Sequence, residues 1–125
     1  MKRLKITMLS IGQRHAEFSD GAPQTAKAIR EALPIESNVS RWVDEIYFAV
    51  PVQMRPENPK EVVNLGDLGY WPPGRALCVF FGPTPASRGG EIRPASPVNV
   101  FGRLVDDPSV FKEARDGERI RLDGA

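Results

Sequence analysis

Residues 66–85, GDLGYWPPGRALCVFFGPTP, place one short and very apolar run between clusters of proline and glycine. The run itself, RALCVFFG at 75–82, is too uniformly apolar to have one face in water, which predicts a strand covered on both sides. Four prolines and four glycines surround it, and the sequences Pro-Pro-Gly and Gly-Pro-Thr-Pro form rigid turns. The stretch therefore predicts a buried strand that leaves the sheet abruptly at both ends.

The size and composition of the chain predict one globular domain over residues 1–125. At this length a domain buries roughly two-thirds of its unfolded surface, and 41% hydrophobic with 26% charged residues is an ordinary balance. A net charge of +1 lacks the basic field of nucleic-acid-binding proteins, so we expect no nucleic-acid partner. The single cysteine, Cys78, excludes an intramolecular disulfide and argues against a zinc cluster, and we expect neither a metal nor a cofactor.

The chain contains no membrane signal. No stretch approaches the roughly 20 apolar residues that cross a bilayer, and the opening MKRLKITML lacks the long apolar region of a signal peptide. We therefore expect a cytoplasmic protein with no membrane partner.

Eight segments are expected to be strands, because each is short, alternates or is apolar throughout, and is bounded by turn residues. They are residues 3–9, 14–19, 37–42, 44–52, 65–71, 75–82, 98–105 and 118–124. The segment 44–52 alternates most clearly, with Ile46, Phe48, Val50 and Val52 on one face and Glu45, Tyr47 and Ala49 on the other. Pro51 lacks a backbone donor and predicts an edge or a bulge near the end of this strand. In the strand at 98–105, Gly102 predicts a bulge or a close backbone approach.

Two short helices are expected. One begins at Asp20 and ends at Pro34, with Pro23 in its first turn. The other covers 107–117, with Asp107 as N-cap, Pro108 at the first helical position and Gly117 after the last. Many short strands in so short a chain favour a mainly β fold, a closed eight-stranded barrel that the two helices cap.

Several segments resemble cyclophilins. The passages FSDGAPQTAKAIREAL (18–33) and VNVFGRLVDDPSVFKEA (98–114) are similar to the two strand-and-helix passages of that family, and Phe80-Phe81 falls where the family has a phenylalanine pair. Closer still, EIYFAVPV (45–52), GYWPPGRALCVFFGPTPAS (69–87) and PASPVNVFG (94–102) resemble small prokaryotic cyclophilin-like proteins of uncharacterised function. The resemblance implies the closed eight-stranded barrel that the strand count also predicts.

The resemblance also implies a ligand groove on the outer wall of the barrel. Cyclophilins bind a proline-containing peptide there with an arginine, and Ala49 stands in the matching place of this sequence. Gln53 and Met54 match the glutamine and methionine of the proline pocket at shorter spacing, and Phe81 matches its phenylalanine. With Glu45 and Tyr47 on the outward face, the predicted ligand-binding residues are Glu45, Tyr47, Gln53, Met54 and Phe81.

Other chemistry-bearing residues have structural interpretations beside the functional ones. Trp71, next to Pro72-Pro73, either covers the mouth of the barrel or stacks on a ligand. His15 in a strand favours a structural role over that of a catalytic base, and Asp67 favours a turn-capping role. Cys78, on the face opposite Val79, favours a buried and inert thiol. The fifteen residues 83–97 form a long loop of a kind that is often functional or mobile.

The leading functional hypothesis is a cyclophilin-like module that binds a proline-containing peptide or a small apolar ligand, with catalytic residues unassigned and a homo-oligomer possible. One alternative is a weak peptidyl-prolyl cis-trans isomerase in which Arg41 or Arg55 replaces the family arginine. Another is an unrelated small enzyme on the same scaffold that uses Glu45 and Tyr47 as its polar groups.

Overall fold

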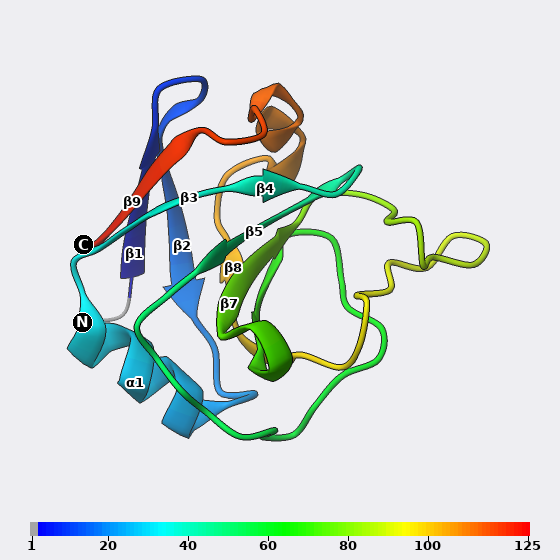
Figure 1. Cartoon of the computed structure of the whole chain (residues 1–125), viewed down its shortest axis with the longest axis horizontal. Helices are drawn as coiled ribbons and strands as arrows, with labels where there is room; N and C mark the ends of the chain where they lie inside the picture. Colours follow the sequence, from blue (N-terminus) through cyan, green and yellow to red (C-terminus); the bar gives the residue numbers. More distant parts are fainter. Residues whose placement is uncertain (1–2) are drawn as a thin grey trace.

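The protein is a nearly closed, nine-stranded antiparallel barrel in a computed structural model that describes residues 3–125 (Figure 1). The strands are β1 (Arg3–Met8), β2 (Gly12–Phe18), β3 (Ile35–Asn38), β4 (Ser40–Arg41), β5 (Glu45–Ala49), β6 (Asp67–Trp71), β7 (Ala76–Phe80), β8 (Asn99–Leu104) and β9 (Arg119–Gly124). Their order around the sheet is β3-β9-β1-β2-β8-β6-β7-β5-β4, and every neighbouring pair is antiparallel.

The barrel is closed by one continuous segment of chain, residues 35–41. Its first half, β3, pairs with β9, and its second half, β4, pairs with β5 at the other end of the strand order. Val39 lies between the two halves, and its N–H still bonds to the carbonyl of Glu118 at 2.9 Å. The single strand predicted at 37–42 is thus two strands with different partners, which is why nine strands stand where eight were expected.

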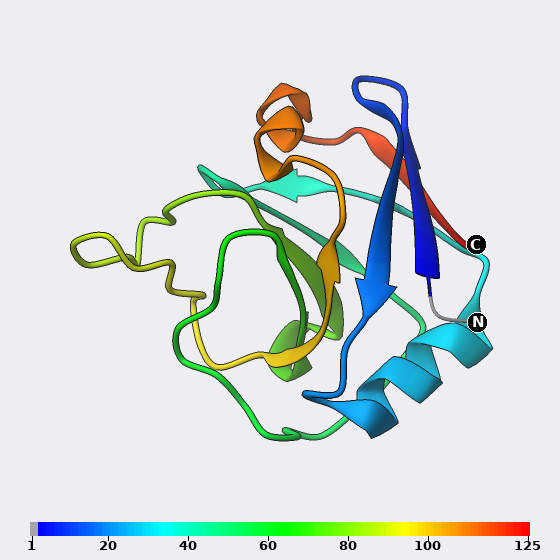
Figure 2. The ribbon, with the colours of Figure 1, turned by 180° about the vertical axis from the view of Figure 1, so that it is seen from behind.

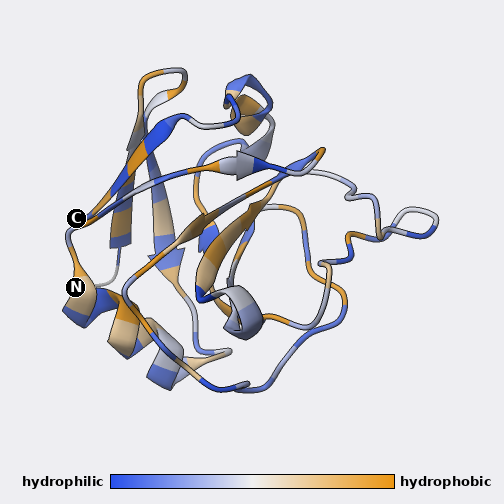
Figure 3. Cartoon of the chain, in the orientation of Figure 1, coloured by the Kyte–Doolittle hydropathy of each residue, from blue (hydrophilic) through white to orange (hydrophobic). Residues whose placement is uncertain are grey.

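The predicted inward faces line the main core. Ile46, Phe48, Val50 and Val52 are all buried in one cluster with side chains of β1, β7 and β9. β5 ends at Ala49, because Pro51 has no N–H for the ladder. β4 pairs only with Ile46 and Tyr47, so the end of β5 is an edge, as Pro51 predicted. In Figure 3, β7 is hydrophobic along its whole length, and all five of its residues are buried, as the uniformly apolar run predicts.

The helix α1 (Pro23–Ala32) lies at one end of the barrel, as both views of the ribbon show (Figures 1 and 2). It begins at Pro23 rather than at Asp20, which does not cap it. Its free N–H groups are instead satisfied by Glu57, whose carboxylate accepts from the backbone of Gln24 at 3.0 Å and of Thr25 at 2.8 Å. Asn99 extends this contact by accepting from the N–H of Glu57 at 2.8 Å.

The second predicted helix is a short 3₁₀ helix, η2 (Pro108–Glu113), at the opposite end of the barrel. Asp107 caps it as expected, accepting from the N–H of Ser109 at 3.0 Å. The segment closes with i→i+3 hydrogen bonds, so Gly117 belongs to the following turn, with φ of +86°, and not to a helix end. A further 3₁₀ turn, η1 (Pro72–Gly74), joins β6 to β7.

Gly102 in β8 meets both expectations for it. The register between β6 and β8 shifts at Leu68/Gly69, beside the pair that Leu68 forms with Gly102. A Cβ on Gly102 would also lie 2.7 Å from the carbonyl oxygen of Glu17, so only glycine lets β2 approach here. None of the helices in the described part of the chain is long and apolar enough to cross a membrane.

Candidate functional site

A second hydrophobic cluster lies on the outer face of the barrel wall. Residues that pair directly across a sheet share a face, and the pairs Glu45–Phe80 and Tyr47–Cys78 belong to the face that points away from the main core. The buried members of this cluster come from β7 and from the loops laid over it, and are Val63, Cys78, Phe80, Ile92 and Val98. The outer wall of β5 and β7 is therefore covered by chain.

A glycine in β6 lets the covering chain lie close to the wall. Gly69 pairs with Cys78 and so belongs to the same outer face. A Cβ on Gly69 would lie 2.8 Å from Cγ2 of Val98 and 3.4 Å from the ring of Phe80. Its missing side chain is the space in which Val98 packs.

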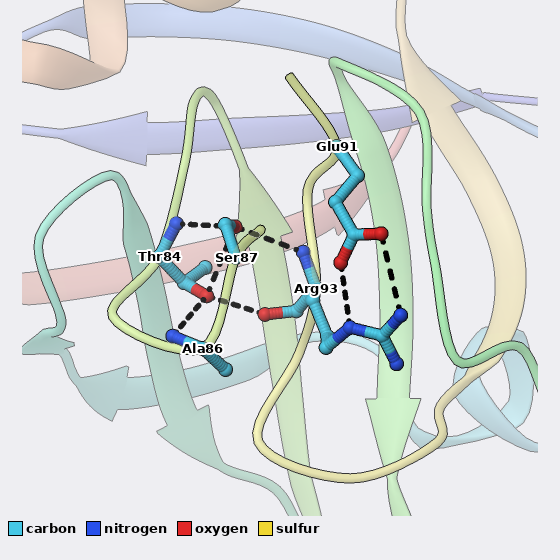
Figure 4. Close-up of polar contacts among 5 residues, drawn as sticks. All are labelled: Thr84, Ala86, Ser87, Glu91 and Arg93. Atoms are coloured by element: carbon cyan, nitrogen blue, oxygen red, sulfur yellow. Dashed lines mark hydrogen bonds and ion pairs between the residues drawn. The ribbon is translucent and has the colours of Figure 1, made fainter. Parts of the chain in front are cut away.

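The covering chain is the second half of the long loop 83–97. Polar side chains hold the base of this loop together (Figure 4). Ser87 Oγ accepts from the N–H of Thr84 at 3.0 Å and from the N–H of Arg93 at 3.1 Å. Thr84 Oγ1 donates to the carbonyl of Arg93, and the Arg93 guanidinium pairs with Glu91 at 2.6 Å. The loop expected to be functional or mobile is thus hydrogen-bonded to itself at its base.

Two short bridges fasten the same loop to the chain before β6. Val63 donates to the carbonyl of Ile92 at 3.0 Å, and Lys60 and Val98 exchange two hydrogen bonds, at 2.8 and 3.1 Å. These bridges hold residues 94–98 over the outer face.

Between this cover and the wall lies a mainly apolar cavity of about 130 Å³, which is several times the roughly 30 Å³ that one water occupies in the liquid. The β4–β5 turn, the strands β5, β6 and β7, and the cover contribute to its walls. The residues that line it are Trp42, Glu45, Tyr47, Trp71, Cys78, Pro94, Ala95 and Val98.

The two tryptophans of the cavity are fixed by different means. Trp42 and Glu45 exchange backbone hydrogen bonds at 2.8 and 3.2 Å across a two-residue turn, in which Val43 has a positive φ of 55°. Trp71 donates from Nε1 to Ser96 Oγ at 2.6 Å, and its ring lies so close to Gly74 that a Cβ there would be 2.5 Å from the ring. The Trp71 ring and the Trp42 backbone are thus held by contacts within the chain.

Glu45 is the polar group of this cavity, and it is almost fully buried, with 4% of its surface exposed. Among residues 3–125, its Oε1 is the one buried side-chain nitrogen or oxygen without a hydrogen-bond partner. Burial raises the pKa of Glu45 to about 7, and the neighbouring Cys78 thiol offsets part of that rise. A carboxyl group in this state exchanges its proton near neutral pH.

Cys78 is the buried thiol that the sequence predicted. It is 2% exposed, and burial together with the nearby Glu45 carboxyl raises its pKa well above the ordinary value. A thiol of this kind stays protonated and is a poor nucleophile.

The structure brings together two of the five predicted ligand-binding residues, because Glu45 and Tyr47 both line the cavity. Gln53 is exposed after the end of β5, and Met54 is half-buried there, held by a hydrogen bond from its N–H to the Tyr70 hydroxyl at 3.1 Å. Phe81 is 2% exposed and belongs to the main core, so it does not line the outer cavity.

Arg41, one of the two arginines considered as a replacement for the cyclophilin arginine, is held elsewhere. Ala49, which matches that position, is exposed. The Arg41 guanidinium lies 5.0 Å from the centre of the Phe81 ring and donates to the carbonyls of Lys112 and Ala114. It is already committed to the main core and to the end of η2.

The sequence interpretation missed Trp42 and the cover at 94–98. Trp42 lies at the end of a weak strand, and only its pairing with Glu45 shows that both side chains share the outer face. Trp71 lines the cavity and packs on Gly74.

Comparisons with known proteins identify the family. A sequence model of the family described as Cyclophilin-like matches residues 2–123. The chain belongs to this family. The solution structure of a hypothetical protein from Archaeoglobus fulgidus is similar, with 45% sequence identity over 99% of this chain and 95% of that one and a TM-score of 0.84. A search of curated proteins found no match.

The cavity and the resemblance to cyclophilin-like proteins involve the same segments. All lining residues except Trp42 lie within 45–52, 69–87 and 94–102, the three stretches that carry the closer resemblance. The three stretches thus include seven of the eight residues that line the cavity.

Proposed function

We propose that this cyclophilin-like protein is a binding module whose outer cavity accepts a small, mainly apolar ligand group. The group belongs either to a free small molecule or to a proline residue of a peptide. The observation that supports this most directly is the cavity itself, in which aromatic side chains surround the buried Glu45 carboxyl, whose Oε1 has no hydrogen-bond partner among the described residues. Apolar concave sites with a few polar groups are the usual form of small-ligand sites.

The fixed position of the Trp71 ring supports the same proposal. A ring that is already held loses little freedom when a ligand binds, so preorganisation favours affinity. The Trp71 indole is held between Ser96 and Gly74, and the Trp42 backbone is held by the turn to Glu45.

A titration followed by amide and indole NMR signals tests this proposal. The chain has two tryptophans, Trp42 and Trp71, and both line the cavity, so both indole N–H signals report on it. We expect a neutral apolar probe such as 3,3-dimethylbutan-1-ol, or a short X–Pro peptide, to shift these signals together with the amides of Tyr47 and Val98. Shifts confined to other surfaces would contradict the proposal.

A matched control separates cavity binding from general apolar adhesion. Leu9 is 98% exposed at the tip of the β1–β2 hairpin. The variant Leu9→Ala removes the most exposed large hydrophobic side chain and leaves the cavity intact, so the shifts at Trp42 and Trp71 are expected to persist in it.

A second candidate function is an acid–base enzyme that uses Glu45. What favours it is the pKa of Glu45 near 7 in an apolar cavity, since a general acid or base works best with a pKa near the working pH. Any activity of this kind is expected to be lost in Glu45→Gln, which keeps the shape of the side chain and removes its titration. Full activity in that variant would exclude the enzyme hypothesis.

A further inference from the structure

We propose that the ligand of the outer cavity is a small organic ammonium ion, with its cationic head beside the rings of Trp42, Tyr47 and Trp71 and the Glu45 carboxyl in the same cavity wall. This inference rests on the proposed function, because it assigns a chemical class to the ligand of that same cavity.

The aromatic side chains supply the first argument. Three of the eight lining residues are aromatic, and they come from the β4–β5 turn, from β5 and from the end of β6. The face of an aromatic ring carries negative potential and attracts a cation, most strongly for tryptophan. Groups of such rings are the usual receptors for alkylated ammonium ions.

The position of Glu45 among these rings supplies the second argument. Trp42 is its partner across the turn, and Tyr47 is the next residue on the same face of β5. The carboxyl thus lies between two of the three aromatic residues. Its Oε1 is buried and has no hydrogen-bond partner among the described residues, so the protein itself leaves this acceptor unsatisfied.

The sign of the charge supplies the third argument. Glu45, Tyr47 and Cys78 are the only lining residues that can ionise, and none of the eight is basic. Burial raises the pKa of the Cys78 thiol well above its ordinary value, so the thiol stays neutral. The cavity therefore offers a negative partner to a cation and no positive partner to an anion.

Arg41, four residues before Glu45 in the chain, does not neutralise this carboxyl. Arg41 pairs with Asp44 at 3.5 Å and lies over the ring of Phe81, in the main core. The cover at 94–98 brings no charged side chain either, since its sequence is Pro-Ala-Ser-Pro-Val. A ligand is left as the source of positive charge.

The charge state of Glu45 gives the inference a pH signature. Its pKa of about 7 means that the carboxyl is mostly neutral at pH 6 and mostly ionised at pH 8. A cation prefers the ionised form, so its apparent affinity is expected to rise about tenfold between these two values, in proportion to the ionised fraction. A neutral ligand of the same shape is expected to show no such rise.

Choline and 3,3-dimethylbutan-1-ol are suitable probes, because the second replaces the cationic nitrogen of the first by carbon and keeps the shape. Dissociation constants for both are measured at pH 6 and pH 8 from the indole signals of Trp42 and Trp71. We expect choline to bind at least about tenfold more tightly than its isostere at pH 8, a difference that follows from one favourable charge interaction.

Two variants and a control locate the effect. Glu45→Gln is expected to abolish the pH dependence and to weaken choline about tenfold while leaving the neutral isostere unchanged. Asp44→Asn removes a carboxylate one position away that does not line the cavity, and choline affinity is expected to change by less than about twofold because the cavity charge remains. Trp71→Leu keeps an apolar side chain but removes the ring, and it is expected to weaken choline more than the isostere.

The outcomes distinguish this inference from the proposed function. Equal binding of choline and its isostere at the indole signals would overturn the ammonium inference and leave the apolar binding site standing. The same holds for a choline preference that Glu45→Gln does not reduce. If neither probe nor an X–Pro peptide shifts the cavity signals, both proposals are wrong.

Discussion

The two faces of the β5–β7 wall are both buried, but by different parts of the chain. The inner face packs into the main core of the barrel, and its side chains are Ile46, Phe48, Leu77 and Val79. The outer face is buried by loops, and its side chains are Glu45, Tyr47, Cys78 and Phe80. The inner face is apolar throughout, whereas the outer face includes a carboxyl, a phenol and a cavity.

This difference indicates what each face does. An inner residue contributes to stability through close packing, and its truncation leaves a cavity that the surroundings fill only in part. The outer face keeps a carboxyl at 4% exposure whose Oε1 has no hydrogen-bond partner among the described residues, which destabilises the fold unless something else compensates. Such an arrangement is typical of functional sites, where stability is lost in exchange for chemistry.

The largest expected effect is on the inner face. Phe48→Ala removes a side chain that is 2% exposed in the main core, and we expect it to lower the free energy of unfolding by about 3–5 kcal/mol. That is a large fraction of the roughly 5–15 kcal/mol of a typical domain. The measurement is urea unfolding followed by circular dichroism.

The matched variant is Tyr47→Ala, the adjacent residue of the same strand on the outer face. Tyr47 is half-buried, so its truncation is expected to lose less than about half as much stability. It is also expected to weaken the binding of cavity ligands. Phe48 does not line the cavity, so Phe48→Ala has no direct effect on that binding. Equal losses of stability in the two variants would mean that the outer face is core like the inner one.

The next effect concerns the carboxyl of the outer face. The folded-state pKa of Glu45, about 7, lies above the ordinary value of 4.5, so the folded state holds the proton more tightly than the unfolded one. The stability that this proton contributes is fully present below pH 4.5 and is lost as the pH rises through 7. The loss amounts to about 3 kcal/mol, at roughly 1.4 kcal/mol for each pH unit between the two values.

Glu45→Gln is expected to remove this loss, because a carboxamide does not titrate. Unfolding free energies measured between pH 5 and pH 8 should fall in the wild type and stay nearly level in the variant. Glu31→Gln, which removes a carboxylate from an exposed position of α1, is the control and should keep the wild-type slope because Glu45 is still present. A wild-type stability that does not fall over this range would show that the carboxyl is ionised without penalty.

The sequence predicted the parts of the structure that depend on neighbours in the chain. The alternation in 44–52 assigned the two faces of β5, and the uniform apolarity of 75–82 predicted that β7 is covered on both sides. Asp107 before Pro108 predicted the N-cap of η2. In each case the pattern and the contact that explains it lie within a few residues.

The parts that were missed depend on contacts between distant segments. The sequence predicted that α1 begins at Asp20. Instead Glu57, more than thirty residues further along the chain, accepts a hydrogen bond from the backbone at the start of α1. Val39 divides one expected strand because its two sides pair with β9 and β5, which no local pattern reveals. Phe81 was placed at the ligand site by resemblance, and its contact with Phe111, at 6.1 Å between ring centres, belongs to the main core instead.

The smallest expected effect tests whether the outer wall is held ready for a ligand. Ser96→Ala removes the hydrogen bond from Trp71 Nε1, at 2.6 Å, and should lower the free energy of unfolding by about 1 kcal/mol. In a Trp42→Phe background, Trp71 is the only tryptophan, so the emission wavelength reports how well the Trp71 ring is shielded from water. We expect a red-shifted emission and weaker binding of a neutral cavity probe, because the indole is then held on one side only, by Gly74.

Ser10→Ala is the matched deletion, since the Ser10 hydroxyl donates to Glu118 at 2.8 Å in a different part of the barrel. It should lower stability by a similar amount without changing the emission of Trp71. If the two serine variants leave the fluorescence equally unchanged, the Ser96 bond does not position the ring, and packing on Gly74 alone fixes it. In that case apolar packing, rather than the polar contacts of the cover, would determine the shape of the cavity.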